Sequence, residues 1–137
     1  MSAPNAPDPA DLVRLMPYAV GLGVRFEEAT PALTRASVQW SAERCTAGGV
    51  MHGGVMMSLA DCVAAVCAFL NLPEGASTTT IESKTNFLRA LRSGTLHASA
   101  RPLHAGRTVI VLQTELVDDE GRAVAHTTQT QAVLAPR

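Results

Sequence analysis

One acidic residue stands within the longest apolar stretch of the chain. Residues 55–70 contain no Lys or Arg, and Asp61 is their only carboxylic acid. A carboxylate inside a buried apolar helix is destabilising unless it is hydrogen-bonded or has a chemical task. Asp61 is therefore a candidate general base or nucleophile. The alternative is that it bonds a neighbouring hydroxyl or lies at an exposed point.

His52, Gly53 and Gly54 come directly before this stretch, where a helix would begin. Glycines at a helix entry let a ligand approach free backbone N–H groups, and the helix dipole favours negative charge there. Such N–H groups can stabilise a carbonyl oxygen as charge develops on it. The alternative is that the two glycines only form a tight turn.

The spacing of the two candidate groups has a geometric consequence. Gly53 and Asp61 are eight residues apart, roughly 12 Å along a helix. A base or nucleophile must approach its target to within about 3–3.5 Å. One subunit's glycine and aspartate therefore cannot serve the same carbonyl. If both are catalytic, a two-fold dimer must bring Asp61 of one subunit to Gly53 of the other.

Hydrophobic periodicity and turn-forming residues predict the helices and strands that position these residues. An Ala-, Leu- and Met-rich stretch without alternation predicts a long helix over residues 55–70. Period-two patterns and turn residues predict strands, and a short helix precedes them at 11–18. The strands are expected at 24–29, 33–40, 78–88, 95–103, 108–118 and 123–134. Ser93-Gly94, Ala105-Gly106 and Glu120-Gly121 are expected to form hairpin turns.

This order predicts an α+β domain in which an antiparallel sheet curls around the long helix. A helix that is apolar on every face must be covered on every side. Part of the apolar surface would still need a partner, so a homodimer is expected.

Composition limits the class of protein. With 137 residues, one domain is expected at 11–137 after a flexible tail at 1–10. A net charge of −1 argues against nucleic acid as a partner. Three cysteines without a C-x-x-C read as reduced thiols, and no signal-peptide pattern or confident membrane span is seen. We therefore expect a cytoplasmic protein that does not bind membranes.

The sequence resembles a known family over nearly its whole length after residue 12. The run from Gly49 to Asp61 (GVMHGGVMMSLAD) is similar to the signature of hotdog-fold acyl-CoA thioesterases. The thioesterases that it resembles are those of the phenylacetic-acid-degradation type, which belong to the 4-hydroxybenzoyl-CoA thioesterase superfamily. The stretch Asn86-Phe87-Leu88-Arg89 and the turn Gly106-Arg107 also look like that family.

The resemblance implies a helix wrapped by a sheet, and dimers that pair into tetramers. It implies hydrolysis of a thioester to a carboxylate and coenzyme A, with no cofactor or metal. Gly53 N–H would polarise the carbonyl, and Asp61 of the other subunit would activate water or attack. His52 would shape the carbonyl end of the pocket, and Thr80 would place a hydroxyl near the acid. Family members often carry Asn where this chain has Thr46, whose hydroxyl has a shorter reach.

The remaining candidates are substrate-binding residues. Arg89 and Arg107, with Lys84 and Arg92, suit the phosphates of coenzyme A, although solvated strand ends explain each of them slightly better. Met57 is expected to line the acyl pocket together with Met51 and Met56, unless these belong to the core. Gly54, Asn86 and Phe87 complete the predicted substrate contacts. The four histidines match no zinc spacing, so no metal is expected.

Two other functions remain open at this point. One is a hotdog dehydratase acting on hydroxyacyl thioesters, which would need a His/acid pair arranged for elimination. The other is a non-catalytic module that binds or senses acyl-CoA. The acyl group is open as well, as is the choice between coenzyme A and a carrier protein.

Overall fold

The N-terminal segment differs from the prediction. The computed structural model describes residues 7–137, so most of the predicted tail at 1–10 lies outside it. Two short helices, α1 (Pro9–Arg14) and α2 (Pro17–Leu22), replace the single helix expected at 11–18, and the last residues of the expected tail belong to α1. The prediction of one helix was wrong because Pro17 cannot donate an N–H and disfavours helical backbone at Met16.

Six antiparallel strands form one sheet, as the alternation predicts. The order across the sheet is β1-β2-β4-β5-β6-β3. The strands are β1 (Arg25–Ala29), β2 (Thr34–Gln39), β3 (Ser77–Phe87), β4 (Thr95–Ala105), β5 (Val109–Val117) and β6 (Ala123–Leu134). Ile110, Leu112 and Leu116 face the core, as expected from their period of two.

One predicted hairpin is absent. The turns at Ala105-Gly106 and Glu120-Gly121 do join neighbouring strands, β4 to β5 and β5 to β6. Ser93-Gly94, by contrast, follows β3, which pairs with β6, and leads to β4, which pairs with β2 and β5. The prediction of a hairpin there was wrong because strand pairing depends on the burial of distant residues, which a local turn signal does not report.

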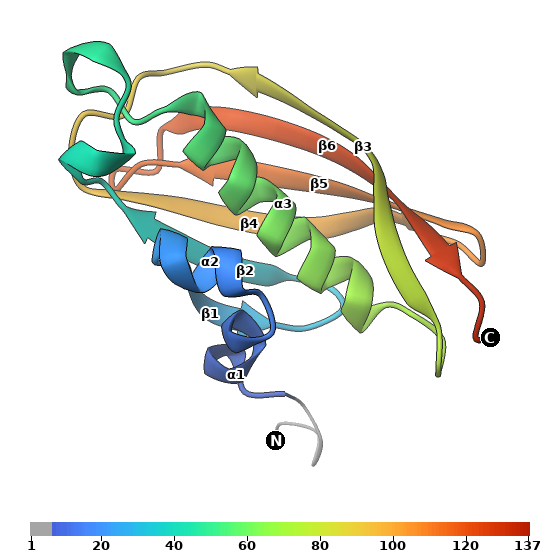
Figure 1. Ribbon diagram of the computed structural model, residues 1–137. Helices are drawn as coiled ribbons and strands as arrows, with labels where there is room; N and C mark the ends of the chain where they lie inside the picture. Colours follow the sequence, from blue (N-terminus) through green and yellow to red (C-terminus); the bar gives the residue numbers. More distant parts are fainter. Residues whose placement is uncertain (1–6) are drawn as a thin grey trace.

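The long helix α3 (Gly53–Leu70) lies across one face of the sheet, with α1 and α2 along one side of it and β3 along the other (Figure 1). Leu59, Val63 and Cys67 face the sheet and are fully buried. Within residues 7–137, α3 is the one helix long and apolar enough to cross a membrane, but 56% of it is buried inside the fold. The buried apolar side chains of α3 therefore form part of the hydrophobic core.

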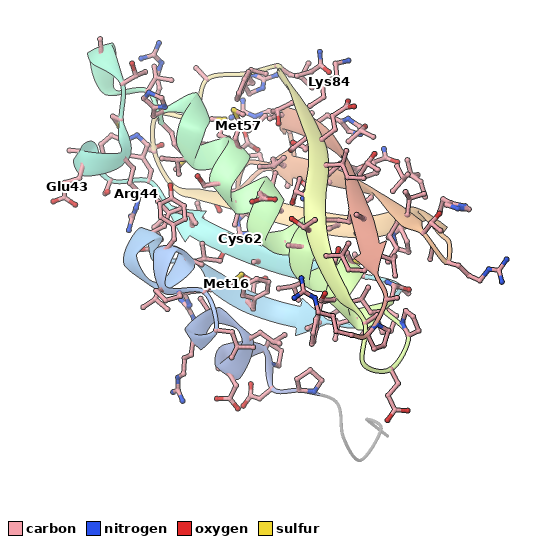
Figure 2. All side chains as sticks on the ribbon, turned by 45° about the vertical axis from the view of Figure 1, so that its right-hand side comes forward. Met16, Glu43, Arg44, Met57, Cys62 and Lys84 are labelled. Carbon is pink, nitrogen blue, oxygen red and sulfur yellow. The ribbon has the colours of Figure 1, made fainter. Side chains whose placement is uncertain are left out.

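The outward face of α3 is uncovered in a single chain, in line with the expectation that the sheet leaves part of the apolar surface open. Met57 and Phe69 are 43% and 53% exposed, and Asp61 lies exposed on the same face. Figure 2 shows Met57 and Cys62 on α3, with Met16 from the segment between α1 and α2 beside the helix. Asp61 is thus at an exposed point of an otherwise buried helix.

Strand β3 contains a bulge that changes which side chains face α3. The register with β6 shifts between Thr80 and Glu82, leaving Ile81 as the extra residue. Because strand side chains alternate, the extra residue exchanges the two faces. Thr80 before the bulge and Ser83 and Phe87 after it consequently point to the same side.

Candidate active site

The N-terminus of α3 is capped by a side chain that the sequence assigned to the carbonyl end of the pocket. His52 Nδ1 accepts a 2.8 Å hydrogen bond from Gly54 N–H. Its neutral ring therefore carries the proton on Nε2. Gly54 N–H is committed to this cap, and a Cβ at Gly54 would approach His52 Nδ1 to 2.9 Å. Gly54 therefore shapes the turn and does not present its N–H to a ligand.

The turn is anchored by backbone hydrogen bonds to two other segments. His52 N–H donates to Arg44 C=O, and Met51 N–H donates to Leu91 C=O, each at 2.8 Å. Among residues 7–137 no acceptor is found for Gly53 N–H, which is among the first N–H groups of α3. A rigid turn thus presents one unpaired N–H with the positive end of the helix dipole behind it.

A pocket of about 360 Å³ opens beside this N–H, and we call it the glycine pocket. It brings together the predicted residues Thr46, Gly53, Phe87 and Arg89. The remaining lining residues are Val50, Met51, Met56, Leu88 and Ala90. The Phe87 ring packs so closely on Gly53 that a Cβ there would lie 3.0 Å from Phe87 Cε1.

Asp61 lines a separate, more open hollow, which we call the acid pocket. Its other lining residues are Met57, Ser58, Thr80 and Ser83. Thr80 Oγ1 lies 3.2 Å from Asp61 Oδ1, as expected for a hydroxyl near the acid. The glycine pocket and the acid pocket share no lining residue, so Gly53 and Asp61 of one chain belong to different hollows.

A buried polar network lies behind Asp61 and was missed by the sequence analysis. Gln129 Nε2 donates to Asp61 Oδ1 at 2.7 Å and to Gln131 Oε1 at 2.8 Å. Thr80 Oγ1 also lies within 2.6 Å of Gln131 Oε1, and Gln131 Nε2 donates to Thr78 Oγ1 at 3.1 Å. Both glutamines are 1% exposed. The continuous run of polar residues at 127–131 was the available signal, because strand alternation turns some of them toward the core, where polar side chains need partners.

Tyr18 is a second residue near the site that sequence reasoning missed. Its hydroxyl lies 2.9 Å from Ser58 Oγ. Ser58 donates its own proton to Gly54 C=O at 2.8 Å, so Tyr18 is the donor in the bond between the two hydroxyls. This bond ties α2 to the outward face of α3 beside the acid pocket.

Two predicted substrate contacts lie elsewhere in a single chain. Asn86 precedes Phe87 on β3, so its side chain points to the opposite face of the sheet. Arg107 lies in the β4–β5 turn, at the end of the sheet opposite the N-terminus of α3 (Figure 1). Of the other cations considered, Lys84 shares the outer face with Asn86, and Arg92 donates to Gly48 C=O at 3.1 Å.

The methionines and cysteines divide between core and site. Met51 and Met56 are buried at the glycine pocket, whereas Met57 lines the acid pocket. Burial, and to a lesser extent the neighbouring charge of Asp61, raise the pKa of Cys62 to about 11. Burial also raises the pKa of Cys67. Both thiols stay protonated at neutral pH and are poor nucleophiles.

In the described chain, no three His, Cys, Asp or Glu side chains gather where a metal could bind.

Solved structures identify the class of protein. The crystal structure of thioesterase HI1161 from Haemophilus influenzae superimposes with a TM-score of 0.89 and 25% identity, covering 98% of this chain and 95% of that one. This likeness confirms the hotdog fold. The Mycobacterium tuberculosis protein Rv1847 is 33% identical over 125 residues, which is 89% of each chain.

The family follows from the sequence match. Residues 48–125, more than half of the chain, match the thioesterase superfamily, and the chain belongs to that superfamily. A further relative is the 1,4-dihydroxy-2-naphthoyl-CoA hydrolase of Escherichia coli, 27% identical over 113 residues, 82% of this chain and 83% of the relative. The protein is therefore a thioester hydrolase, and of the three functions considered from sequence the hydrolase is supported. The phenylacetic-acid-degradation subtype stays a prediction.

Proposed function

We propose that the protein hydrolyses acyl-CoA thioesters at a site shared by two subunits. Asp61 of one subunit acts on a carbonyl that Gly53 N–H of the other subunit polarises. Membership of the thioesterase superfamily and the coenzyme A thioester named for the Escherichia coli relative support the substrate class. The products are a carboxylate and free coenzyme A.

The separation of the two half-sites is the observation that carries this proposal. Gly53 and Asp61 lie on one continuous helix, and eight residues of helix rise by roughly 12 Å. Each residue lines its own pocket, with its own set of neighbours. A single carbonyl cannot contact both within one chain. A two-fold axis beside α3 would place each Asp61 opposite the other subunit's glycine turn.

An unpartnered apolar surface supports a second copy as the missing half. Met57 and Phe69 on α3 and Ile81 and Phe87 on β3 are all more than two-fifths exposed. Strand β3 is at one edge of the sheet, so its outer row of backbone groups is free to pair. A self-complementary contact through β3 and the outward face of α3 would cover both features.

The chemistry needs only groups that the chain provides. Gln129 donates to Oδ1 of Asp61, Thr80 Oγ1 lies 3.2 Å from the same oxygen, and among residues 7–137 no hydrogen bond occupies Oδ2. Oδ2 would either take a proton from the attacking water or attack the carbonyl carbon itself. Negative charge on the carbonyl oxygen would be stabilised by Gly53 N–H of the partner subunit and its helix dipole. The carbon–sulfur bond then breaks, and the thiolate of coenzyme A leaves and takes up a proton.

The two routes differ in where the new oxygen comes from. Direct attack by Asp61 forms an anhydride, and in oxygen-18 water its hydrolysis labels the carboxylate of Asp61 when water attacks Cγ, whereas attack on the acyl carbon labels only the product. A general base never labels that carboxylate. Label found by mass spectrometry in the peptide containing Asp61 after a single turnover would therefore identify the nucleophilic route.

Around the carbonyl, the glycine pocket offers groups for the rest of the substrate. Arg89 contributes a cation at its rim, suited to the phosphates of coenzyme A. Thr46 lines the same pocket, and its hydroxyl makes none of the hydrogen bonds found among residues 7–137. It is therefore free to bond water or the substrate.

Mixed dimers test the shared site. Asp61→Asn and Gly53→Val subunits, each inactive alone, are combined and the tagged heterodimer is purified. One of its two sites then joins an intact Asp61 to an intact Gly53, so thiol release should recover to about half the parental rate. If both residues served the same subunit's site, every site in the heterodimer would be damaged. A confirmed heterodimer without activity would overturn the proposal.

A further inference from the structure

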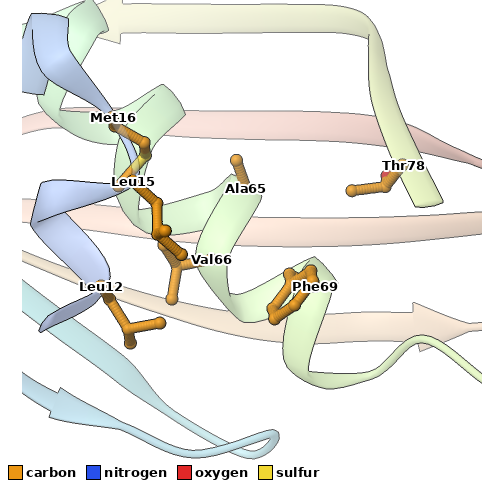
Figure 3. A pocket seen from close by; sticks show the side chains of 7 residues that line it. All are labelled: Leu12, Leu15, Met16, Ala65, Val66, Phe69 and Thr78. Atoms are coloured by element: carbon orange, nitrogen blue, oxygen red, sulfur yellow. The ribbon is translucent and has the colours of Figure 1, made fainter. Parts of the chain in front are cut away.

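A third pocket lies on the outward side of α3, on the far side of Asp61 from Gly53. Its volume is about 210 Å³. Figure 3 shows the side chains that line it. Leu12, Leu15 and Met16 of the N-terminal segment form one wall. The opposite walls come from α3 and from the start of β3. We call it the α1–α3 pocket.

The lining of the α1–α3 pocket is hydrocarbon almost throughout. Ala65, Val66 and Phe69 line its α3 side, and no charged residue takes part. The one hydroxyl, that of Thr78, already donates to Ala132 C=O at 2.8 Å and accepts from Gln131 Nε2 at 3.1 Å. A polar group entering this pocket would lose its water without gaining a partner.

The α1–α3 pocket is continuous with the acid pocket along two elements. Asp61, Ala65 and Phe69 are four residues apart in turn, so they follow one another on the same face of α3. One helical turn, roughly 6 Å, separates Asp61 from Ala65. On β3, Thr78 and Thr80 are two residues apart and face the same side, with Thr80 against Asp61. A chain attached to a carbonyl at Asp61 therefore meets the α1–α3 pocket next.

We infer that the α1–α3 pocket receives the acyl group, and that the preferred substrates are thioesters of apolar acids without a polar group at the far end. This inference rests on the proposed function. An apolar cavity of about 150 Å³ binds benzene, so a pocket of this volume suits a hydrocarbon group of roughly six to nine carbons. The dihydroxylated acyl group named for the Escherichia coli relative would leave its hydroxyls unpaired there.

The N-terminal segment is then the specificity-determining part of the chain. Leu15 is 74% exposed, and together with Leu12 and Met16 it contacts no part of the glycine pocket. Its position over Val66 gives the pocket its depth (Figure 3). Changes in this wall would alter which acyl chain fits and leave the reacting carbonyl where it is.

The test compares three substrates: butanoyl-CoA, octanoyl-CoA and 8-hydroxyoctanoyl-CoA. Each buried methylene favours binding by about fourfold, so kcat/KM should be on the order of 100-fold higher for octanoyl-CoA than for butanoyl-CoA. The terminal hydroxyl should lower it by about tenfold or more. Ala65→Phe fills the pocket and should reduce kcat/KM for octanoyl-CoA at least tenfold more than kcat/KM for butanoyl-CoA. Ala123→Phe, the same change at an exposed strand position, should leave all three rates unaltered.

Each other outcome has a defined meaning. Equal rates for the three substrates, with hydrolysis still dependent on Asp61, would overturn this inference and leave the proposed function standing. No hydrolysis of any thioester would overturn both. If Ala65→Phe dissociates the oligomer and lowers all rates equally, a second copy and not the acyl group fills the pocket. Should Ala65→Phe not fold, Phe69→Ala must move the preference from octanoyl-CoA to longer chains, and an unchanged preference would refute the inference.

Discussion

Gln129 donates a 2.7 Å hydrogen bond to the carboxylate of Asp61 from a strand position that is 1% exposed. The donor is held in turn, because the second proton of the same amide goes to Gln131 Oε1. Gln129 lines neither the glycine pocket nor the acid pocket. It is therefore a positioning residue, which fixes one carboxylate oxygen and leaves the other directed outward.

Replacing Gln129 by Met should lower kcat while the fold is kept. A hydrogen bond to a charged group contributes about 1.5–3 kcal/mol, so we expect a loss of roughly 10- to 100-fold in kcat with KM little changed. Gln113→Met is the matched control, because Gln113 bonds His126 on the outer face of the sheet. Steady-state kinetics with a thermal melt of each variant separates positioning from misfolding. Equal kcat in the two variants would remove the assigned role.

Gln129→Glu tests the same contact by charge. The new carboxylate would stand next to Asp61, and two like charges so close together raise the pKa of the pair. The acid limb of the kcat against pH profile should therefore move to higher pH by about one unit or more. A purely structural role would lower the rate without moving this limb.

Gly53→Ala should impair catalysis through Phe87. The added methyl would lie 3.0 Å from the ring and force it toward the glycine pocket. We expect kcat/KM to fall by about tenfold, with partial recovery in Gly53→Ala/Phe87→Leu, where the ring is gone. Gly21→Ala serves as the control, since a Cβ there meets nothing within 4 Å. A Gly53→Ala enzyme with the parental kcat/KM would show that the close contact has no catalytic consequence.

The position of Ile81 leads to a prediction about assembly. It is 61% exposed at the bulge of the edge strand β3. A buried unpaired charge is strongly destabilising, so Ile81→Arg should dissociate the proposed dimer and remove activity with it. Leu103→Arg places the same charge at a residue that is 57% exposed on β4, and it should leave mass and activity unchanged. Sedimentation analysis at assay concentration measures both, and an active Ile81→Arg monomer would contradict the shared site.

The buried thiol of Cys62 makes stability depend on alkaline pH. Its pKa is about 11 in the fold, against 9.0 for an ordinary thiol. As pH rises from 9 to 11 the unfolded chain loses this proton first, so the free energy of unfolding falls. At 1.36 kcal/mol per pKa unit the loss is about 2–3 kcal/mol. Urea denaturation at several pH values should show a flatter dependence for Cys62→Ala, and identical slopes would refute the prediction.

Local patterns predicted most of the elements. The period of two in residues 108–118 reports directly which side chains are buried, and the structure places strands there and at 123–134, as predicted. The residues that interrupt helices and strands were interpreted less accurately. Pro17 was a visible signal for dividing the N-terminal helix, whereas Ser93-Gly94 resembled a hairpin turn although the next strand pairs elsewhere. Partner choice between strands is non-local, and a single turn does not contain it.

The residues of the candidate site also fall into two groups, those that local sequence patterns predict and those that depend on contacts between distant segments. The separation of Gly53 and Asp61 follows from their spacing in sequence and the rise of a helix. Thr46, Phe87 and Arg89 do gather at Gly53. Gln129 could not be found in this manner, because its contact with Asp61 spans 68 residues of sequence and depends on how α3 packs over β6. Asn86 lies on the outer face of β3, opposite His126, so within one chain it does not join this group.

That bulge also limits how this strand can change in length. Deleting Ile81 would remove only the extra residue, so Glu82 would follow Thr80 in register and Ser83 and Phe87 would keep their partners on β6 and stay on the helix side. One residue inserted after the bulge would instead turn every later side chain of β3 to the opposite face, whereas an insertion in a surface loop shifts only its neighbours. The number of residues in β3 therefore decides which side chains face α3, just as the identity of those side chains decides what they can do there.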